Sequence, residues 1–293
     1  MDGMSIDLHT HSCYSDGVYS PAELVLMAKR LNVNVLAIAD HDSVAGISDA
    51  LTAALGSGVE IIPAVELSVQ FEQFKDVHLL GYGIDFSDQS FLSLINEFRN
   101  KRERRNYEIL ELVNIQLSSE CRSPIGIDEV LAFSHDAVGR PHIARALLEL
   151  KYVDTVEEAF QRYLIPCNVP KSFWNFEVAI NEIHRIGGVA ILAHPTSISK
   201  NLPELKRIIT SLKSLGLDGI EVFNNMGWPQ EIEFLRRLAI EQNLIITAGS
   251  DFHGIEEGIE IGKGREGMRF DSSLIAPLIA GITKQQSKSR ITG

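Results

Sequence analysis

The segment DLHTHSCYSDG, residues 7–17, carries His9, His11 and Asp16 directly after a short apolar run. Residues two apart in an extended chain point to the same side, so His9 and His11 can offer both imidazoles to one ion. Asp251 and His253 have the same spacing. Imidazole and carboxylate ligands together suit zinc, manganese or iron, whereas calcium and magnesium favour oxygen ligands alone. These residues therefore predict a transition-metal site.

Further histidines and acids lie beside other short apolar runs. Barrels of alternating strands and helices collect their catalytic residues at the C-terminal ends of the strands. So large a set predicts two or three divalent ions (Mn, Zn or Fe) rather than one, with Glu66 as the carboxylate that bridges them. The residues are Asp40, His41 and Asp42 after VLAIA, Glu66 after IIPAV, His194 after AILA, and His78 within VHLLGYGI.

One further acid and two further histidines are not counted among the predicted metal ligands. Glu221, in DGIEVF, is near a strand end and is equally suited to ligation, to a role behind the ligands, or to facing solvent. His135 and His184 fall in predicted helices, and we interpret them as surface or packing residues. A single HxH motif is weak evidence for a metal, and the prediction depends on the whole set.

The elements that would position these residues alternate between strand and helix. Seven apolar runs are predicted as buried strands, and the helix after the first is indicated by Ser20, Pro21 and Glu23, which form a capping-box pattern. This alternation is typical of parallel α/β architecture. It stops between residues 97 and 175, which we predict to be a helical insertion in a barrel domain formed by 1–96 and 176–293. The predicted strands are 5–8, 33–39, 60–65, 77–84, 188–193, 218–223 and 244–249.

The composition of the chain argues against several classes of protein. The chain has 293 residues, 45% of them hydrophobic, and a net charge of -12, which argues against a broad basic face for duplex DNA. Three widely spaced cysteines indicate neither disulfides nor a thiolate zinc site. The first residues lack the basic start and apolar stretch of a signal peptide, and no apolar run is long enough to span a membrane, so we expect a soluble cytoplasmic protein. No protein partner is predicted.

The motifs HTH, ADHDSVAG, AVELS, AHP and GSDFHG occur in this order along nearly the whole chain. Together they resemble the polymerase and histidinol phosphatase (PHP) superfamily of metal-dependent phosphoesterases. The resemblance implies a distorted seven-stranded, TIM-like α/β barrel with its metals at the C-terminal rim.

The same resemblance implies three metal sites. Many relatives have histidine where this chain has Asp16, so the third site is expected to bind its ion more weakly. Asp40 and Asp42 flank His41 and are expected to orient neighbouring groups. The implied ligands are His9, His11, Glu66 and Asp251 for the first ion, Glu66, His78 and His194 for the second, and Asp16, His41 and His253 for the third.

Two motifs in the insertion, GRPHIARAL at 139–147 and VPKSFW at 169–174, look like those of nucleoside 3′,5′-bisphosphate phosphatases and exoribonucleases that act from the 5′ end. We expect Arg140, His142 and Lys171 to bind substrate phosphate, with Arg145 as a weaker candidate. Phe173 or Trp174 could stack on a base, although a core position is at least as well supported.

The predicted reaction is hydrolysis of a phosphate ester by a metal-activated hydroxide, with Glu66, Asp251 and His194 as catalytic residues. The substrate is a small phosphorylated molecule, either a nucleoside 3′,5′-bisphosphate or a short RNA 5′ end. The basic run NKRERRN, 100–106, is interpreted as a solvated helix face that could instead guide RNA. Two alternatives stay open: a phosphatase for histidinol phosphate or another small molecule, and a metal-stabilised domain without catalysis.

Overall fold

A computed structural model describes residues 5–132 and 139–292 of the chain. The predicted residue His135 lies outside these ranges. The predicted capping box is confirmed: Ser20 accepts a hydrogen bond from the backbone N–H of Glu23, and Pro21 begins the helix. The helices are α1 Pro21–Arg30, α2 Ile47–Ala54, α3 Gln89–Ser119, α4 Ile127–Leu131, α5 Arg140–Glu149, α6 Val156–Ala159, α7 Phe176–Arg185, α8 Leu202–Ser214, α9 Pro229–Glu241 and α10 Ile275–Thr292.

The strands form two sheets, of three strands in the order β1-β2-β3 and of six in the order β6-β4-β5-β7-β8-β9. The run 60–65, predicted as one strand, is divided at Pro63, because proline has no backbone N–H to donate to a ladder. The strands are β1 Ser5–Thr10, β2 Val33–Ile38, β3 Glu60–Ile61, β4 Ala64–Phe71, β5 Phe74–Tyr82, β6 Trp174–Asn175, β7 Val189–Leu192, β8 Gly219–Phe223 and β9 Ile245–Ala248.

The predicted seven-stranded parallel arrangement differs from this result in two respects. β5 is antiparallel to both β4 and β7. Within residues 5–132 and 139–292, continuous strand pairing does not close into a ring, and isolated parallel bridges join the sheets instead. One bridge links Thr10 to Phe252, and the other links His41 to Glu66.

The antiparallel direction of β5 explains how a residue early in its strand reaches the metal rim. His78 pairs with Ser68 in the second half of β4, and its carbonyl accepts the N–H of Ala193 just after β7. Because β5 runs against its neighbours, its first half lies beside their C-terminal ends. His78 is thereby placed with residues that follow the other strands.

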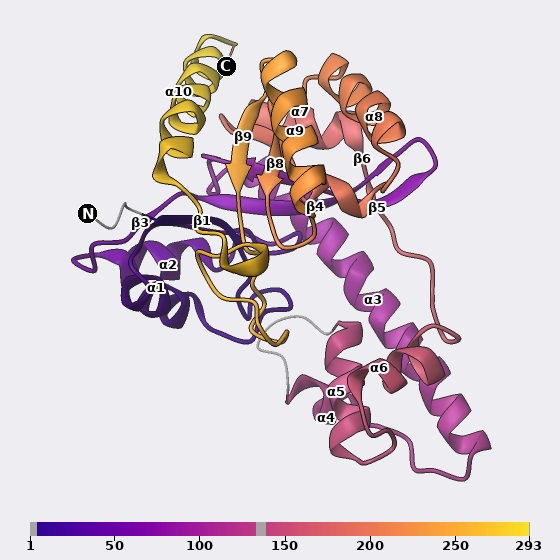
Figure 1. Cartoon of the computed structure of the whole chain (residues 1–293). Coiled ribbons are helices and arrows are strands. Elements are labelled where there is room, and N and C mark those ends of the chain that lie inside the picture. Colours follow the sequence, from indigo (N-terminus) through magenta and orange to yellow (C-terminus); the bar gives the residue numbers. More distant parts are fainter. Residues whose placement is uncertain (1–4, 133–138, 293) are drawn as a thin grey trace.

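The helices between β5 and β6 have a core of their own. Ile95 near the start of α3 belongs to the large core of the sheets, whereas Ile109 and Val113 belong to a separate cluster with Leu147 of α5 and Tyr163. α3 extends from the sheets to this second group of helices, α4, α5 and α6 (Figure 1). The division of the chain at residues 97 and 175 stays a prediction. Across the described ranges, no helix is both long and apolar enough to cross a membrane.

Candidate metal centre

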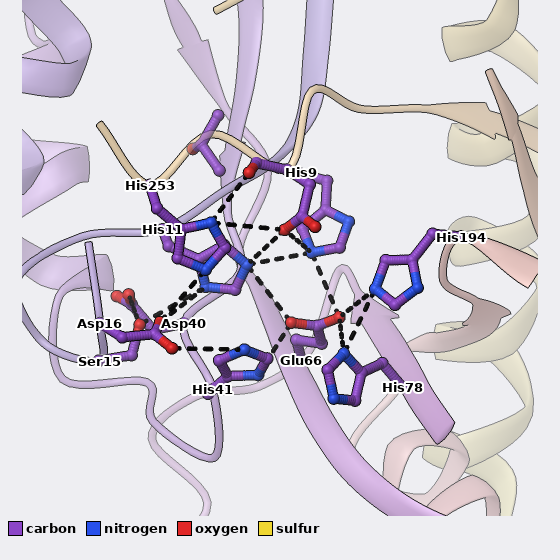
Figure 2. A network of polar contacts seen from close by, with 12 residues as sticks. His9, His11, Ser15, Asp16, Asp40, His41, Glu66, His78, His194 and His253 are labelled. Atoms are coloured by element: carbon purple, nitrogen blue, oxygen red, sulfur yellow. Dashed lines mark hydrogen bonds and ion pairs between the residues drawn. The ribbon is translucent and has the colours of Figure 1, made fainter. Parts of the chain in front are cut away.

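The predicted metal ligands converge at one place (Figure 2), where β1, β2, β7 and β9 end and where Glu66 of β4 and His78 of β5 meet them. Their nitrogen and oxygen atoms form overlapping groups within 4.8 Å of one another. Every residue predicted as a ligand belongs to at least one group. The groups are His9, His11 and Asp251; His9, Glu66 and His194; His41, Glu66 and His78; and His11, Asp16, His41 and His253.

The first group is held by the extended backbone of β1. His9 and His11 are fully buried, and their Nε2 atoms lie 3.2 Å apart. Asp251 Oδ1 is 3.1 Å from His11 Nε2 and 3.5 Å from His9 Nε2. Asp251 has a φ of 56° and His194 a φ of 25°, in a region that residues with a Cβ rarely adopt. Such strain is common where a fold aims side chains at a functional centre.

Glu66 is fully buried at the middle of the centre, and its two oxygens face different groups. Oε1 lies 3.0 Å from His78 Nδ1 and 3.3 Å from His194 Nε2. Oε2 lies 2.9 Å from His41 Nδ1 and 3.3 Å from His11 Nε2. A carboxylate in this position can contact two ions at once and offset their mutual repulsion.

Asp16 lies at the outer side of the centre. Its oxygens are 3.8 Å from His41 Nε2 and 3.4 Å from His253 Nε2. Burial alone would raise the pKa of Asp16, but the imidazoles of His41 and His253 hold it well below its usual range. Asp16 is therefore a carboxylate at neutral pH, as ligation requires.

The donors fit divalent cations. Asp16 Oδ1, His41 Nδ1 and Glu66 Oε2 are buried and have no hydrogen-bond partner among the described residues. Buried polar atoms without partners are rare and call for an explanation. Glu66 Oε2 lies 2.9 Å from His41 Nδ1, and Asp16 Oδ1 lies 3.4 Å from His253 Nε2. Ions with imidazole and carboxylate ligands would satisfy these atoms.

The charges of the centre also fit an ion. Burial would lower the pKa of His9, yet the carboxylates of Glu66 and Glu221 raise it well above its usual value. Burial would also lower the pKa of His78, but the carboxylates of Glu66 and Asp76 raise it to about 9. Burial favours a protonated Glu66, but the surrounding histidines keep its pKa well below the ordinary range. Protons and cations thus compete for one set of ligands.

Other buried acids orient the ligands from behind. Glu221 Oε1 is 2.9 Å from His9 Nδ1, and Glu221 Oε2 accepts the backbone N–H of His194 at 2.8 Å. Nε2 of His9 is thereby left facing the centre. Asp40 accepts hydrogen bonds from the hydroxyls of Ser12 and Ser15. Of the roles open for Glu221, this geometry favours the one behind the ligands.

The three residues expected to bind substrate phosphate differ in their surroundings. Lys171 forms an ion pair with Asp76, whose Oδ1 is 3.3 Å from His78 Nε2. His142 is buried; its Nδ1 accepts the N–H of Gly139 at 2.9 Å, and burial lowers its pKa to about 4. The guanidinium of Arg140 lies 5.7 Å from the ring centre of Phe160. Of the three, as far as the described residues show, Lys171 is the one that an ion pair connects to the centre, through Asp76.

The basic run NKRERRN is a solvated helix face only in part, and for two arginines that interpretation was wrong. Arg102 lies with Nη2 3.6 Å from Asp16 Oδ2, and its Nη1 donates to the carbonyl of His41 at 3.4 Å. Arg105 donates to the carbonyl of Val169 at 2.7 Å. Both arginines follow the helical spacing of buried Ile95 and Ile109 on α3, a signal that could have identified them.

The stacking role considered for Trp174 was also wrong. Trp174 is 1% exposed, stacks on Phe98 with ring centres 4.2 Å apart, and donates from Nε1 to Asp42 at 3.1 Å. It is a core residue that holds the loop containing His41. Phe173 is half-buried beneath Lys171, whose Nζ lies 5.5 Å from the ring centre.

Comparison with known proteins gives consistent results. The family model described as the PHP domain matches residues 7–169. A 5′-3′ exoribonuclease of Haemophilus influenzae is 36% identical over 263 residues, which cover 88% of this chain and 93% of that protein. A 3′,5′-nucleoside bisphosphate phosphatase of Chromobacterium violaceum is 30% identical, with 87% and 89% covered.

Solved structures agree with these relatives. A protein of Bifidobacterium adolescentis, provisionally described as a metal-dependent phosphoesterase, superposes with a TM-score of 0.80 at 28% sequence identity. The match covers 94% of this chain and 95% of that one. The fold of this chain therefore recurs over nearly the full length of another protein.

Proposed function

The chain belongs to the PHP-domain family and is a phosphoesterase, and from this premise we propose that its substrates are nucleoside 3′,5′-bisphosphates or the 5′-phosphorylated ends of short RNAs. Two relatives that match most of its length are named for these two activities. Both substrates carry more than one phosphate. The site must then hold a second anionic group besides the one that reacts.

The observation that carries this proposal is the position of Arg102. It lies against Asp16 and the carbonyl of His41, both at the metal centre, and its side chain is 18% exposed. A guanidinium presents paired donors that match phosphate oxygens. Arg102 can therefore exchange its present contacts for a substrate phosphate at the edge of the centre. Lys171 offers a second cation beside His78.

The residues of this chain have distinct tasks in that reaction. Bound divalent ions would supply an activated water and neutralise the phosphoryl oxygens. We assign the ligation of these ions to the residues predicted from the sequence, with Glu66 bridging between them. Glu221 holds His9 in the orientation that leaves Nε2 toward the centre. Arg102, Arg140, His142 and Lys171 bind and orient the remainder of the substrate.

We also infer that seven of the strands act as the distorted barrel that the sequence predicted. β1, β2, β4, β5, β7, β8 and β9 are neighbours in turn if the bridges Thr10–Phe252 and His41–Glu66 are included. Both bridges involve the rim. The separate core of the 109–167 region supports the assignment of 97–175 as an insertion.

The proposal is tested by assaying phosphate and nucleotide release from three compounds after chelation and addition of manganese. The compounds are a nucleoside 3′,5′-bisphosphate, a 5′-phosphorylated RNA oligomer and histidinol phosphate. We expect turnover of the first, the second or both, and its loss in the His9→Ala variant. Turnover of histidinol phosphate alone would overturn the nucleotide assignment and leave the metal centre intact.

A further inference from the structure

An exposed tryptophan lies near the metal rim on the loop between β8 and α9. Trp228 is 53% exposed, whereas Trp174 is buried at 1%. The guanidinium of Arg265 lies 4.1 Å from the ring centre of Trp228. Stacking on a cation fixes the indole and leaves exposed ring surface for a ligand. None of the residues assigned to the reaction above contributes to this pair.

Hydrogen bonds connect the pair to the metal centre. Arg265 Nε donates to the carbonyl of Asn225 at 3.1 Å, and Asn225 Nδ2 donates to the carbonyl of Ser250 at 2.7 Å. Ser250 directly precedes Asp251, which faces His9 and His11. The C-terminal ends of β8 and β9 point toward this loop region (Figure 1). The Trp228–Arg265 pair is thus built on the same edge of the sheet as the metal ligands.

A cavity of about 550 Å³ lies beside the pair, between α9 and the short helical turn Arg265–Gly267. Phe223, Ile232 and Met268 give it apolar walls, and its lining also includes the charged side chains of Glu233, Arg236, Arg265 and Glu266. Arg236 is paired with Glu233. Ligand cavities commonly combine apolar walls with a few polar groups in this range of volume. The apolar part suits a flat ring, and Arg265 offers a cation to a phosphate attached to that ring.

Arg102 and Lys171 attach to other parts of the centre. Arg102 contacts Asp16 after β1 and the carbonyl of His41 after β2, and Lys171 reaches the centre through Asp76 on β5. The Trp228–Arg265 pair is joined to the ends of β8 and β9 instead. A ligand that reaches both sets must extend across the metal centre. An RNA of two or more nucleotides has the length for this, and its unpaired bases can stack on an aromatic ring.

We propose that Trp228, Arg265 and the adjacent cavity form a binding subsite for an unpaired nucleotide of an RNA substrate, one or more residues away from the phosphate that reacts. This inference rests on the proposed function. It adds that the site is built for oligonucleotides, because a bisphosphate bound at the centre and at Arg102 would not need the subsite. Trp228 supplies the stacking surface, and Arg265 fixes the indole and attracts the RNA backbone.

The first test is a fluorescence titration, because the chain has two tryptophans and Trp228 is the exposed one. The probe is a 5′-phosphorylated RNA trimer with phosphorothioate linkages, added to the protein as purified. We expect saturable quenching in the wild type that is absent in Trp228→Phe, where Trp174 remains as the reporter. Equal quenching in both proteins, or none in the wild type, would overturn the subsite.

The second test separates the subsite from the proposed function. Trp228→Ala is expected to lower kcat/KM for the RNA trimer by about tenfold, because the base loses its stacking partner. It should leave kcat/KM for a nucleoside 3′,5′-bisphosphate unchanged, and Trp228→Phe should retain most of the trimer activity. Leu55→Ala, at another exposed apolar side chain, serves as the control.

Equal losses on both substrates, or no loss on the trimer, would overturn the inference while leaving the phosphoesterase assignment in place. If the wild-type protein hydrolyses neither substrate, the nucleotide assignment fails. The fluorescence titration still decides whether the subsite binds RNA in that case.

Discussion

The metal centre and the cationic face formed by Arg102 and Lys171 are built in opposite ways. Around Glu66, the side chains are short, are at most 17% exposed, and each contacts several others. Arg102 and Lys171 are only slightly more exposed, at 18% and 23%, but their side chains are long. Each reaches the centre through one or two contacts.

Because of this difference, we assign the reaction to the metal centre and the choice of substrate to the cationic face. Residues on adjoining strand ends are fixed by the backbone ladders, so the ligand geometry has little freedom. Arginine and lysine side chains on a helix and a loop can exchange a protein partner for a phosphate at small cost. We therefore expect substitutions at the centre to abolish turnover of every substrate, and substitutions on the cationic face to act mainly through substrate binding.

The largest effect is expected from Glu66→Gln. The substitution keeps the shape of the side chain but removes the charge that faces both groups of histidines. We expect hydrolysis to fall by ~10³-fold or more, with less metal retained per chain. Metal analysis and phosphate release measure this. The matched control is Glu72→Gln, at an exposed acid paired with Arg207. Full activity with full metal content in Glu66→Gln would refute the bridging role.

Arg102→Ala tests the cationic face. Loss of a charge-assisted contact to phosphate should lower kcat/KM by ~10²-fold, because hydrogen bonds to charged groups contribute about 1.5–3 kcal/mol. The metal content should stay at the wild-type level, which would sharpen the contrast with Glu66. Arg104→Ala, at an exposed arginine on the same helix, is the control. A loss of metal in Arg102→Ala would instead make this arginine part of the centre.

We expect Glu221→Gln to lower activity only by weakening metal binding. The neutral amide of the variant no longer favours the orientation of His9 in which Nε2 faces the centre. Residues that orient ligands in this way typically affect metal affinity by roughly tenfold or more. We expect excess manganese to restore kcat, which a titration of activity against metal would reveal. A kcat that stays low at saturating metal would argue for a direct part in the reaction.

The smallest effect is expected from Lys171→Ala, since Lys171 already has a carboxylate partner in Asp76. We predict a rise in KM of about fivefold with little change in kcat, in line with the modest energies of half-exposed ion pairs. The double variant with Asp76→Ala completes a mutant cycle. Additive effects in that cycle would show that the two residues act independently and would weaken the link from Lys171 to His78.

Residue type and spacing were sufficient to predict which side chains come together at the candidate metal centre. HTH places two ligands on one side of an extended segment, and this local geometry holds wherever the segment lies. For DFH the expectation of one shared ion was wrong, because Asp251 has a positive φ and joins a different group from His253. The start of α1 at Ser20 and Pro21 was predictable for the same reason, because a cap depends on neighbours within three residues. The family resemblance added the grouping of ligands around Glu66.

Contacts between distant parts of the chain had to be decided by the tertiary structure. The direction of β5, which carries His78 to the rim, follows from its pairing with both β4 and β7. Arg102 faces Asp16 because α3 packs against the sheets, and Trp228 meets Arg265 because two loops adjoin at the ends of β8 and β9. The sequence alone determined which chemical groups are available, since type and local spacing are written in it. The fold decided which of them face one another, because long-range packing has no signature in the spacing of neighbouring residues.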